Sequence, residues 1–145
     1  MKKKFVNPDY AKGKHYQRAM KEIVLAAVCP LCPKTMRWHT KPILRRHSGW
    51  LITENFSPYK NTRHHLILVR EKHAEHFAQL TATDWASIAT LVRWALVRFR
   101  IRGGAVALRF GDTTYTGATV AHLHLHLIVP KVKKGKASPV YFPIG

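Results

Sequence analysis

The chain has 145 residues, 46% of them hydrophobic, and its 25 lysines and arginines against 7 acidic residues give a formal net charge of +18. This composition excludes a disordered or fibrous protein, because there are enough apolar side chains for one hydrophobic core. No apolar run reaches the roughly 18 to 20 residues that span a bilayer, so we expect no membrane partner. The basic start at residues 2–4 is followed by Pro8 rather than by an apolar signal-peptide core, and we expect a cytoplasmic protein.

The excess positive charge is spread along the chain, with denser groups at residues 2–4, 93–102 and 131–136. A surface of this kind attracts polyanions, which include nucleotides, nucleic acid and acidic lipid. For any single lysine the alternative is an ordinary solvated position. The charge therefore predicts an anionic partner without identifying it.

The first third of the chain predicts one helix followed by strands. Residues 1–12 are polar and basic, and we expect them to be loosely ordered before a single domain over residues 13–145. Apolar side chains recur on one face from His15 to Val28, which predicts a helix that Pro30 ends. Three runs rich in β-branched and apolar residues then predict strands at residues 42–47, 50–56 and 64–70.

The remainder predicts a second helix and two more strands. Thr83 and Asp84 can cap a helix that runs to Arg100, where a pair of glycines follows. A strand is predicted at residues 105–110, an irregular Gly/Thr-rich segment at 111–121, and a last strand ending at Val129. Strands interrupted by two helices predict an α+β fold with an antiparallel sheet.

Three histidines occupy alternate positions in the last strand: His122, His124 and His126. Because a strand alternates its faces, the three imidazoles are predicted to share one face while the intervening leucines occupy the other. Histidine titrates near neutrality and serves as nucleophile, acid, base or metal ligand. This strand is therefore the main candidate for the active site.

The only two cysteines, Cys29 and Cys32, form a C-x-x-C motif, which is typical of a zinc half-site or of a redox pair. A redox pair normally opens a helix, whose N-terminus lowers the thiol pKa. Here the pair follows a helix, which favours zinc. Zinc needs two further ligands, and His73 and His122 are the best candidates, with His76 as a rival.

The segment from Gly117 to Ile128 resembles the signature of the histidine triad (HIT) family of nucleotide hydrolases and transferases, in which His-x-His-x-His is followed by hydrophobic residues. Asn55-Phe-Ser-Pro58 and the strand that leads to His73 resemble the family's ribose-binding turn and next strand. The resemblance covers roughly residues 14–130. It implies a HIT-like fold with an antiparallel five-stranded sheet and two main helices, and a homodimer.

The C-x-x-C motif resembles the zinc-bearing branch of this family. In that branch the zinc ligands fall on positions that correspond to Cys29, Cys32, His73 and His122. A closed site of four protein ligands is structural, because no coordination position is left for water. The resemblance thus implies a structural Zn²⁺ that fixes the first helix to the sheet.

The resemblance also implies the roles of the remaining triad residues. His124 is the nucleophile that attacks the α-phosphorus and forms a covalent nucleotidyl-histidine. His126 donates a hydrogen bond to the phosphate or to the leaving oxygen. Thr119 contacts phosphate, and backbone N–H groups from Gly117 to Val120 can surround the phosphate oxygens.

Several positions depart from the family pattern. Asn55 stands where an acid often binds the ribose hydroxyls, and the alternative for Asn55 is a turn residue beside Pro58. Arg70 and Glu71 replace a proline and a lysine, and Ala118 replaces a polar amide. Asn55 can still bind the ribose hydroxyls, but the sequence does not predict which leaving group is preferred.

These inferences predict an enzyme that hydrolyses or transfers at the α-phosphate of a purine nucleotide conjugate. One alternative keeps the chemistry and brings nucleic acid to the site, so that the protein removes AMP from DNA ends. Another is a zinc-stabilised module that binds nucleotides or nucleic acid without turnover.

Overall fold

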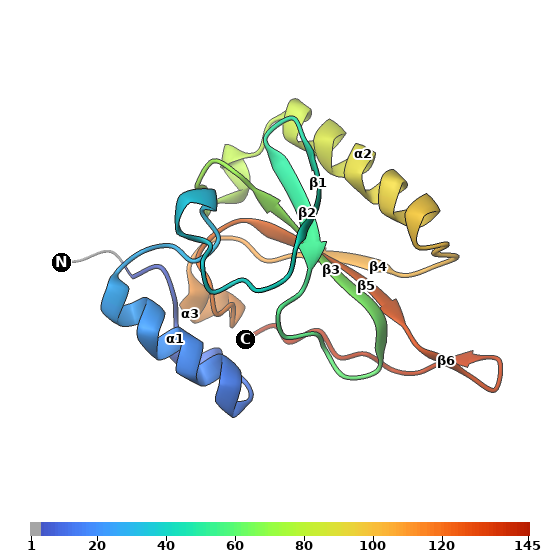
Figure 1. Ribbon diagram of the computed structural model, residues 1–145, viewed down its shortest axis with the longest axis horizontal. Coiled ribbons are helices and arrows are strands. Elements are labelled where there is room, and N and C mark those ends of the chain that lie inside the picture. Colours follow the sequence, from blue (N-terminus) through green and yellow to red (C-terminus); the bar gives the residue numbers. More distant parts are fainter. Residues whose placement is uncertain (1–3) are drawn as a thin grey trace.

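A five-stranded antiparallel sheet in the order β1-β2-β3-β5-β4 forms the centre of the protein in the computed structural model, which describes residues 4–145 (Figure 1). Each strand therefore pairs with neighbours that run in the opposite direction. The strands are β1 (Ile43–His47), β2 (Trp50–Glu54), β3 (Thr62–Arg70), β4 (Ala105–Leu108) and β5 (His124–Pro130).

Two main helices cover opposite faces of this sheet, α1 (Lys14–Ala26) on one and α2 (Ala82–Arg98) on the other (Figure 1). The structure confirms the predicted α+β fold with an antiparallel five-stranded sheet and two main helices. No helix in the described part of the chain is long and apolar enough to cross a bilayer. The smaller elements are α3 (Thr113–Thr116), the hairpin strands β6 (Val132–Lys133) and β7 (Lys136–Ala137), and three 3₁₀ turns at Pro8–Tyr10, Pro33–Thr35 and Phe77–Gln79.

The central strands are apolar on both faces because both faces are buried. Leu51 and Val69 are paired across β2 and β3 and pack with α1. Their neighbours Ile52 and Leu68 are also paired and pack with α2. On β5 the α1 side instead carries histidines, since His126 pairs with Ile67 and His124 with Val69. The sheet thus presents its imidazoles to the layer that contains α1.

The last strand begins two residues later than predicted. β5 starts at His124, and His122 lies in the segment before it. The N–H of Leu123 donates to the Ala74 carbonyl at 2.7 Å, and its carbonyl accepts from the Arg70 N–H at 3.3 Å. These bonds draw the segment toward the residues after β3, so the prediction of three imidazoles on one strand face was wrong for His122.

Residues 1–12 were expected to be loosely ordered, and residues 1–3 of that segment lie outside the described residues. Val6 and Ala11 are buried, and Val6 forms an isolated antiparallel bridge with Val120. The segment packs in the same cluster as α1 because its apolar side chains cover the site-side face of the sheet. The domain boundary at residue 13 stays a prediction.

The cap of α2 is Thr81 rather than the predicted Thr83. The Thr81 hydroxyl accepts from the Asp84 N–H at 3.3 Å, and the Asp84 carboxylate accepts from the Thr81 N–H at 2.8 Å. This reciprocal pair is a capping box, which satisfies the N–H groups of Thr81 and Asp84 at the helix start. Asp84 therefore occupies the third helical position and is buried.

Candidate metal centre and nucleotide site

Four predicted zinc ligands converge between the α1 turn and the ends of β3 and β5. The possible ligand atoms of Cys29, Cys32, His73 and His122 all lie within 4.8 Å of one another. The turn after α1 supplies the cysteines, and Thr35 holds it by donating to the carbonyls of both of them. The rival ligand His76 is not part of the cluster.

The spacing of these atoms fits a tetrahedral zinc ion. Cys29 Sγ lies 3.2 Å from Nδ1 of His122, and Cys32 Sγ lies 3.4 Å from Nδ1 of His73. The two Nδ1 atoms are 3.1 Å apart. Zn–S bonds of about 2.3 Å and Zn–N bonds of about 2.0–2.1 Å in tetrahedral geometry separate neighbouring ligand atoms by about 3.3–3.8 Å. The donor set and the spacing both fit Zn²⁺.

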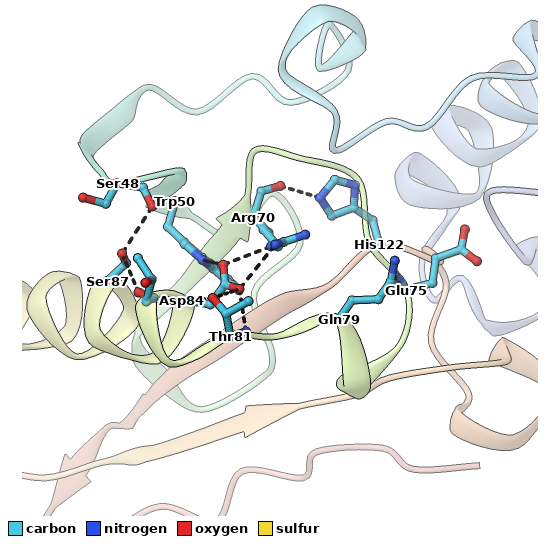
Figure 2. A network of polar contacts seen from close by, with 10 residues as sticks. Ser48, Trp50, Arg70, Glu75, Gln79, Thr81, Asp84, Ser87 and His122 are labelled. Carbon is cyan, nitrogen blue, oxygen red and sulfur yellow. Dashed lines mark hydrogen bonds and ion pairs between the residues drawn. The ribbon is translucent and has the colours of Figure 1, made fainter.

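Both histidines are oriented by hydrogen bonds from Nε2, the ring nitrogen that does not face the cluster. Nε2 of His122 donates to the Arg70 carbonyl at 2.6 Å, as Figure 2 shows. Nε2 of His73 donates to the Glu75 carboxylate at 2.9 Å. A proton on Nε2 leaves Nδ1 as the free lone pair of a neutral imidazole, which is the form that binds metal.

Burial also determines the protonation state of the Cys29 thiol. The Cys29 thiol lies away from water, and this burial raises its pKa to about 12. The free thiol therefore holds its proton at neutral pH. Zinc requires the thiolate, and its charge lowers the pKa of a coordinating thiol. Metal binding at this site is therefore coupled to proton release.

His124 follows two residues after the ligand His122. Its Nδ1 donates to the His122 carbonyl at 2.6 Å, which places the lone pair of the neutral ring on Nε2. Burial is the largest effect on the pKa of His124, and together with the charge of Arg109 it outweighs the opposing hydrogen bond to the His122 carbonyl and lowers that pKa to about 4. The ring is therefore neutral at pH 7.

A chain of hydrogen bonds defines the proton positions on His126. The Tyr59 N–H donates to Nδ1 of His65 at 3.0 Å, so a neutral His65 carries its proton on Nε2. That nitrogen lies 2.8 Å from Nδ1 of His126, which becomes the acceptor. Nε2 of His126 is then a donor, and it is buried without a protein partner among residues 4–145. Such an unpaired N–H is available to a ligand.

A cavity of about 290 Å³ opens beside these imidazoles. His124 and His126 line it, together with residues of the segment before β5. Aromatic side chains line the remainder, and the ring centroids of Tyr16 and Phe56 are 6.2 Å apart. An apolar cavity with a few polar groups at one end is the usual form of a small-molecule site.

The predicted phosphate-binding segment lines this cavity, but its N–H groups are not equivalent. The Gly117 N–H donates to the Thr113 carbonyl at 3.0 Å, and the Ala118 N–H to the Thr116 hydroxyl at 3.2 Å. Among the described residues, the N–H groups of Thr119 and Val120 have no such partner. The predicted phosphate-binding segment therefore has two free N–H donors. Gly117 forms a left-handed turn in this segment, with φ of 64°.

Asn55 lines the cavity and also forms the turn that was its alternative. Its Oδ1 accepts from the Ser57 N–H at 2.8 Å, and its Nδ2 lies 3.1 Å from Nε2 of His65. Asn55 is therefore a turn residue in the cavity lining, and its ribose-binding role stays a prediction.

Three residues of the site were not predicted from the sequence. His65 and Tyr59 set the proton positions on His126, and Arg109 lines the cavity. His65 carries a signal, because it lies at the start of a predicted strand two positions before Ile67, which is directly opposite His126. Arg109 is one of many basic residues, and only the pairing of β4 with β5 places it at the site.

Solved structures show which proteins share this fold. A histidine triad nucleotide-binding protein from Candida albicans matches with a TM-score of 0.60 and 17% identity, over 81% of this chain and 85% of that chain. The fold is that of the histidine triad proteins. A zinc-bound histidine triad family protein from Mycobacterium smegmatis matches with a TM-score of 0.55 and 20% identity, over 79% of this chain and 83% of that chain.

A HIT family hydrolase from Clostridium thermocellum also matches, with a TM-score of 0.52 and 18% identity, over 74% of this chain and 94% of that chain. No protein-family model matches the sequence, and a comparison with curated proteins finds no significant match. At these identities the similarity to histidine triad structures establishes the fold.

The two departures at the end of β3 have structural roles in this histidine triad fold. The Arg70 side chain donates to the Asp84 carboxylate, with Nε 3.0 Å from Oδ1. Glu71 forms an ion pair with Arg46 of β1. These contacts join the end of β3 to α2 and to the edge of the sheet.

Proposed function

We propose that this protein is a HIT-family enzyme that hydrolyses or transfers at the α-phosphate of purine nucleotide conjugates, with His124 as the nucleophile. The observation that carries the proposal is the hydrogen bond from Nδ1 of His124 to the His122 carbonyl. It leaves the Nε2 lone pair of a neutral imidazole as the group that can attack a phosphorus in the cavity.

His126 complements this nucleophile as the hydrogen-bond donor. Its buried Nε2–H has no protein partner among residues 4–145, and the centroids of the His124 and His126 rings are 4.9 Å apart. A donor fixed beside the nucleophile stabilises charge on a phosphoryl oxygen or on the leaving oxygen. The free N–H groups of Thr119 and Val120 supply further donors to the phosphate.

The bond changes follow from this geometry. Nε2 of His124 attacks the α-phosphorus, the bond to the leaving group breaks, and the electron pair departs with the leaving atom. Water or another acceptor then attacks the nucleotidyl-histidine, releases the nucleotide and restores His124. The aromatic cavity walls, which include Tyr16 and Phe56, support stacking of the base.

The proposed role of zinc is structural. All four donors come from protein side chains, which leaves a tetrahedral ion no open position. Zn²⁺ bound there fixes the His122 backbone, whose carbonyl in turn orients His124. A cytoplasmic location remains our expectation from the sequence.

A homodimer is also proposed. β4 lies at the edge of the sheet with free backbone groups, and Val106 on it is 56% exposed. Val97 on α2 is 81% exposed. Edge strands with apolar neighbours pair readily across a two-fold axis. Light scattering should give twice the mass of the chain for wild type and the monomer mass for Val106→Lys.

A direct assay tests the enzymatic proposal. Adenosine 5′-phosphoramidate and diadenosine triphosphate are offered to wild type and to His124→Ala. We expect turnover by wild type and a loss of about a thousandfold or more in the variant, because the nucleophile is removed. Mass spectrometry of quenched wild type should detect a nucleotidyl adduct on His124. No turnover of either compound, or equal turnover by both proteins, overturns the proposal.

One feature favours a second candidate function, in which the same reaction acts on a nucleic acid substrate. Arg45 lies over the Trp94 ring at 5.7 Å, and Arg98 over the Phe99 ring at 5.3 Å, in a chain of charge +18. Arginine beside aromatic rings is typical of single-strand binding surfaces. Binding of a 5′-adenylylated oligonucleotide should then weaken steeply with salt. Weak binding that does not depend on salt contradicts this second candidate.

A further inference from the structure

Arg109, directly after β4, is held in a fixed position at the catalytic end of the cavity. Its Nε and Nη2 donate to the Pro143 carbonyl at 2.9 and 2.6 Å. Nη2 also lies 3.1 Å from the Tyr59 hydroxyl, and the guanidinium lies 4.0 Å from the centre of the Phe142 ring. A guanidinium held by contacts with three residues loses little further entropy when it binds a ligand.

The same contacts bring Arg109 next to the triad. The Phe142 ring packs edge-on against the His126 ring with centroids 5.2 Å apart. The Tyr59 ring is stacked on the His126 ring with centroids 5.8 Å apart. Arg109 thus contacts the Phe142 ring and the Tyr59 hydroxyl, which belong to two side chains packed on His126, the proposed donor to the leaving group.

The guanidinium is only partly used by the protein. Among residues 4–145, no group accepts a hydrogen bond from Nη1 of Arg109, and no carboxylate lies within ion-pair distance of it. The cavity lining contains two further cations, Lys12 and Lys60, and none of the acidic residues of the chain. The cavity lining therefore carries three basic side chains and no carboxylate to balance them.

We propose that Arg109 binds the leaving group of the substrate and makes the site selective for nucleotides whose α-phosphate carries a further phosphate. This proposal rests on the proposed function and specifies its substrate class. Arginine forms paired, charge-assisted hydrogen bonds with phosphate oxygens, and Nη1 keeps its two donors free for them.

The reaction requires only the substrate, His124 and water. As the N–P bond to His124 forms, the bond from the α-phosphorus to the bridging oxygen breaks, and that oxygen retains the electron pair. The departing phosphate thereby gains one negative charge, which Arg109 is placed to stabilise. Water subsequently attacks the α-phosphorus, the N–P bond breaks, and the nucleoside monophosphate leaves as the water proton is released to solvent.

The same charges disfavour the other leaving groups of this chemistry. A lysine side chain joined to the α-phosphate departs as an amine and becomes a cation. Such a cation meets Arg109 and the two lysines with no carboxylate to bind it. Like-charge contact in a partly desolvated site costs binding free energy, so substrates with amine leaving groups gain nothing from Arg109.

The test compares two leaving groups on the same nucleotide. kcat and KM are measured for diadenosine triphosphate and for adenosine 5′-phosphoramidate with wild type, Arg109→Lys and Arg109→Gln. We expect Arg109→Gln to lower kcat/KM for the triphosphate by about 100-fold, the usual effect of removing one transition-state donor. For the phosphoramidate we expect a change of less than about tenfold, and Arg109→Lys should restore part of the activity lost with the triphosphate.

Arg102→Gln is the matched control, because it removes the same charge from an exposed position outside the cavity lining. It should leave both reactions unchanged. Equal losses with the two substrates in Arg109→Gln overturn the proposal while leaving the enzymatic function intact, and so does a wild type that prefers the phosphoramidate. If wild type turns over neither compound, the proposed function itself fails. Circular dichroism and the melting temperature establish that each variant is folded.

Discussion

The Arg70 carbonyl accepts a hydrogen bond from Nε2 of His122 at 2.6 Å, while the Arg70 side chain binds Asp84 at the start of α2 (Figure 2). One residue at the end of β3 therefore orients a proposed zinc ligand with its backbone and binds the start of a helix with its side chain. Because the His122 carbonyl in turn orients His124, the metal centre and the proposed nucleophile share one rigid segment.

The first prediction concerns Asp84, which is buried and accepts hydrogen bonds from Arg70, Trp50 and Thr81. Asp84→Asn keeps the shape but leaves the Arg70 charge largely unpaired. We expect the free energy of unfolding to fall by about 3–5 kcal/mol, the usual cost of removing one partner of a buried pair. Urea denaturation followed by circular dichroism measures it.

Glu54→Gln is the control for this measurement. Glu54 is exposed and lies 3.8 Å from Lys41, so its loss should cost less than about 1 kcal/mol. Equal costs for the two variants contradict the assigned role of Asp84.

The second prediction is the pH dependence of this contribution. Burial tends to raise the pKa of Asp84, but the hydrogen bonds from Arg70, Thr81 and Trp50 outweigh it and hold that pKa well below its ordinary value. A carboxyl whose pKa is lowered by folding stabilises the protein above its unfolded pKa of about 3.9 and loses that effect as the pH falls. The stability difference between wild type and Asp84→Asn should therefore be constant above about pH 5 and shrink toward pH 3. A difference that grows on acidification contradicts this sign.

Much of the fold could be predicted because periodicity reports burial. The apolar pattern of α1 and the continuous apolar runs of β2 and β3 follow directly from which faces are covered. The start of α2 was misplaced because Thr81 and Thr83 are both acceptable caps, and only the reciprocal bond with Asp84 distinguishes them. The start of β5 was misplaced because alternation continues through His122 although the backbone has already left the ladder.

The site, like the fold, could be predicted from the sequence only in part. Cys29, Cys32, His73 and His122 could be proposed from ligand type and spacing, and the structure brings them together. The remaining site residues depend on contacts between distant segments. Arg109 is held by the Pro143 carbonyl, 34 positions away, and no local pattern distinguishes it from the other arginines.

The third prediction is the metal content. Purified wild type should contain about one zinc ion per chain by X-ray fluorescence or mass spectrometry, because four donors are in place. Cys32→Ser should lose most of it and melt at a lower temperature, since zinc binding contributes to folding. His76→Ala serves as the control, because His76 lies outside the cluster and the variant should retain its zinc. Loss of zinc in the control together with retention in Cys32→Ser contradicts the assigned ligand set.

The fourth prediction concerns Glu75, which accepts a hydrogen bond from the proposed zinc ligand His73. Glu75 accepts from Nε2 of His73 at 2.9 Å, which fixes that ring and makes Nδ1 a stronger ligand. Glu75→Ala should weaken zinc binding by about 10- to 100-fold in competition with a chromogenic chelator. Glu54→Ala removes an exposed carboxylate elsewhere and should leave the affinity unchanged. Unchanged affinity in Glu75→Ala contradicts the assigned contact.

The last prediction concerns His65, which donates to Nδ1 of His126 and so makes Nε2 of His126 a donor. His65→Phe removes this constraint while filling the same buried space. We expect kcat to fall by about 10- to 100-fold with little change in KM, because the loss concerns the protonation state of His126 rather than substrate binding. His65→Gln, which can still accept from the Tyr59 N–H and donate an amide hydrogen, should recover part of the rate.

His64→Phe provides the comparison for this experiment. His64 neighbours His65 on β3 but contacts the Phe99 ring at 5.2 Å on the opposite face of the sheet. A purely structural effect of introducing phenylalanine into β3 should affect both variants, whereas control of the His126 proton affects only His65→Phe. If the two variants lose activity equally, or if KM alone changes, His65 does not position the proton of His126.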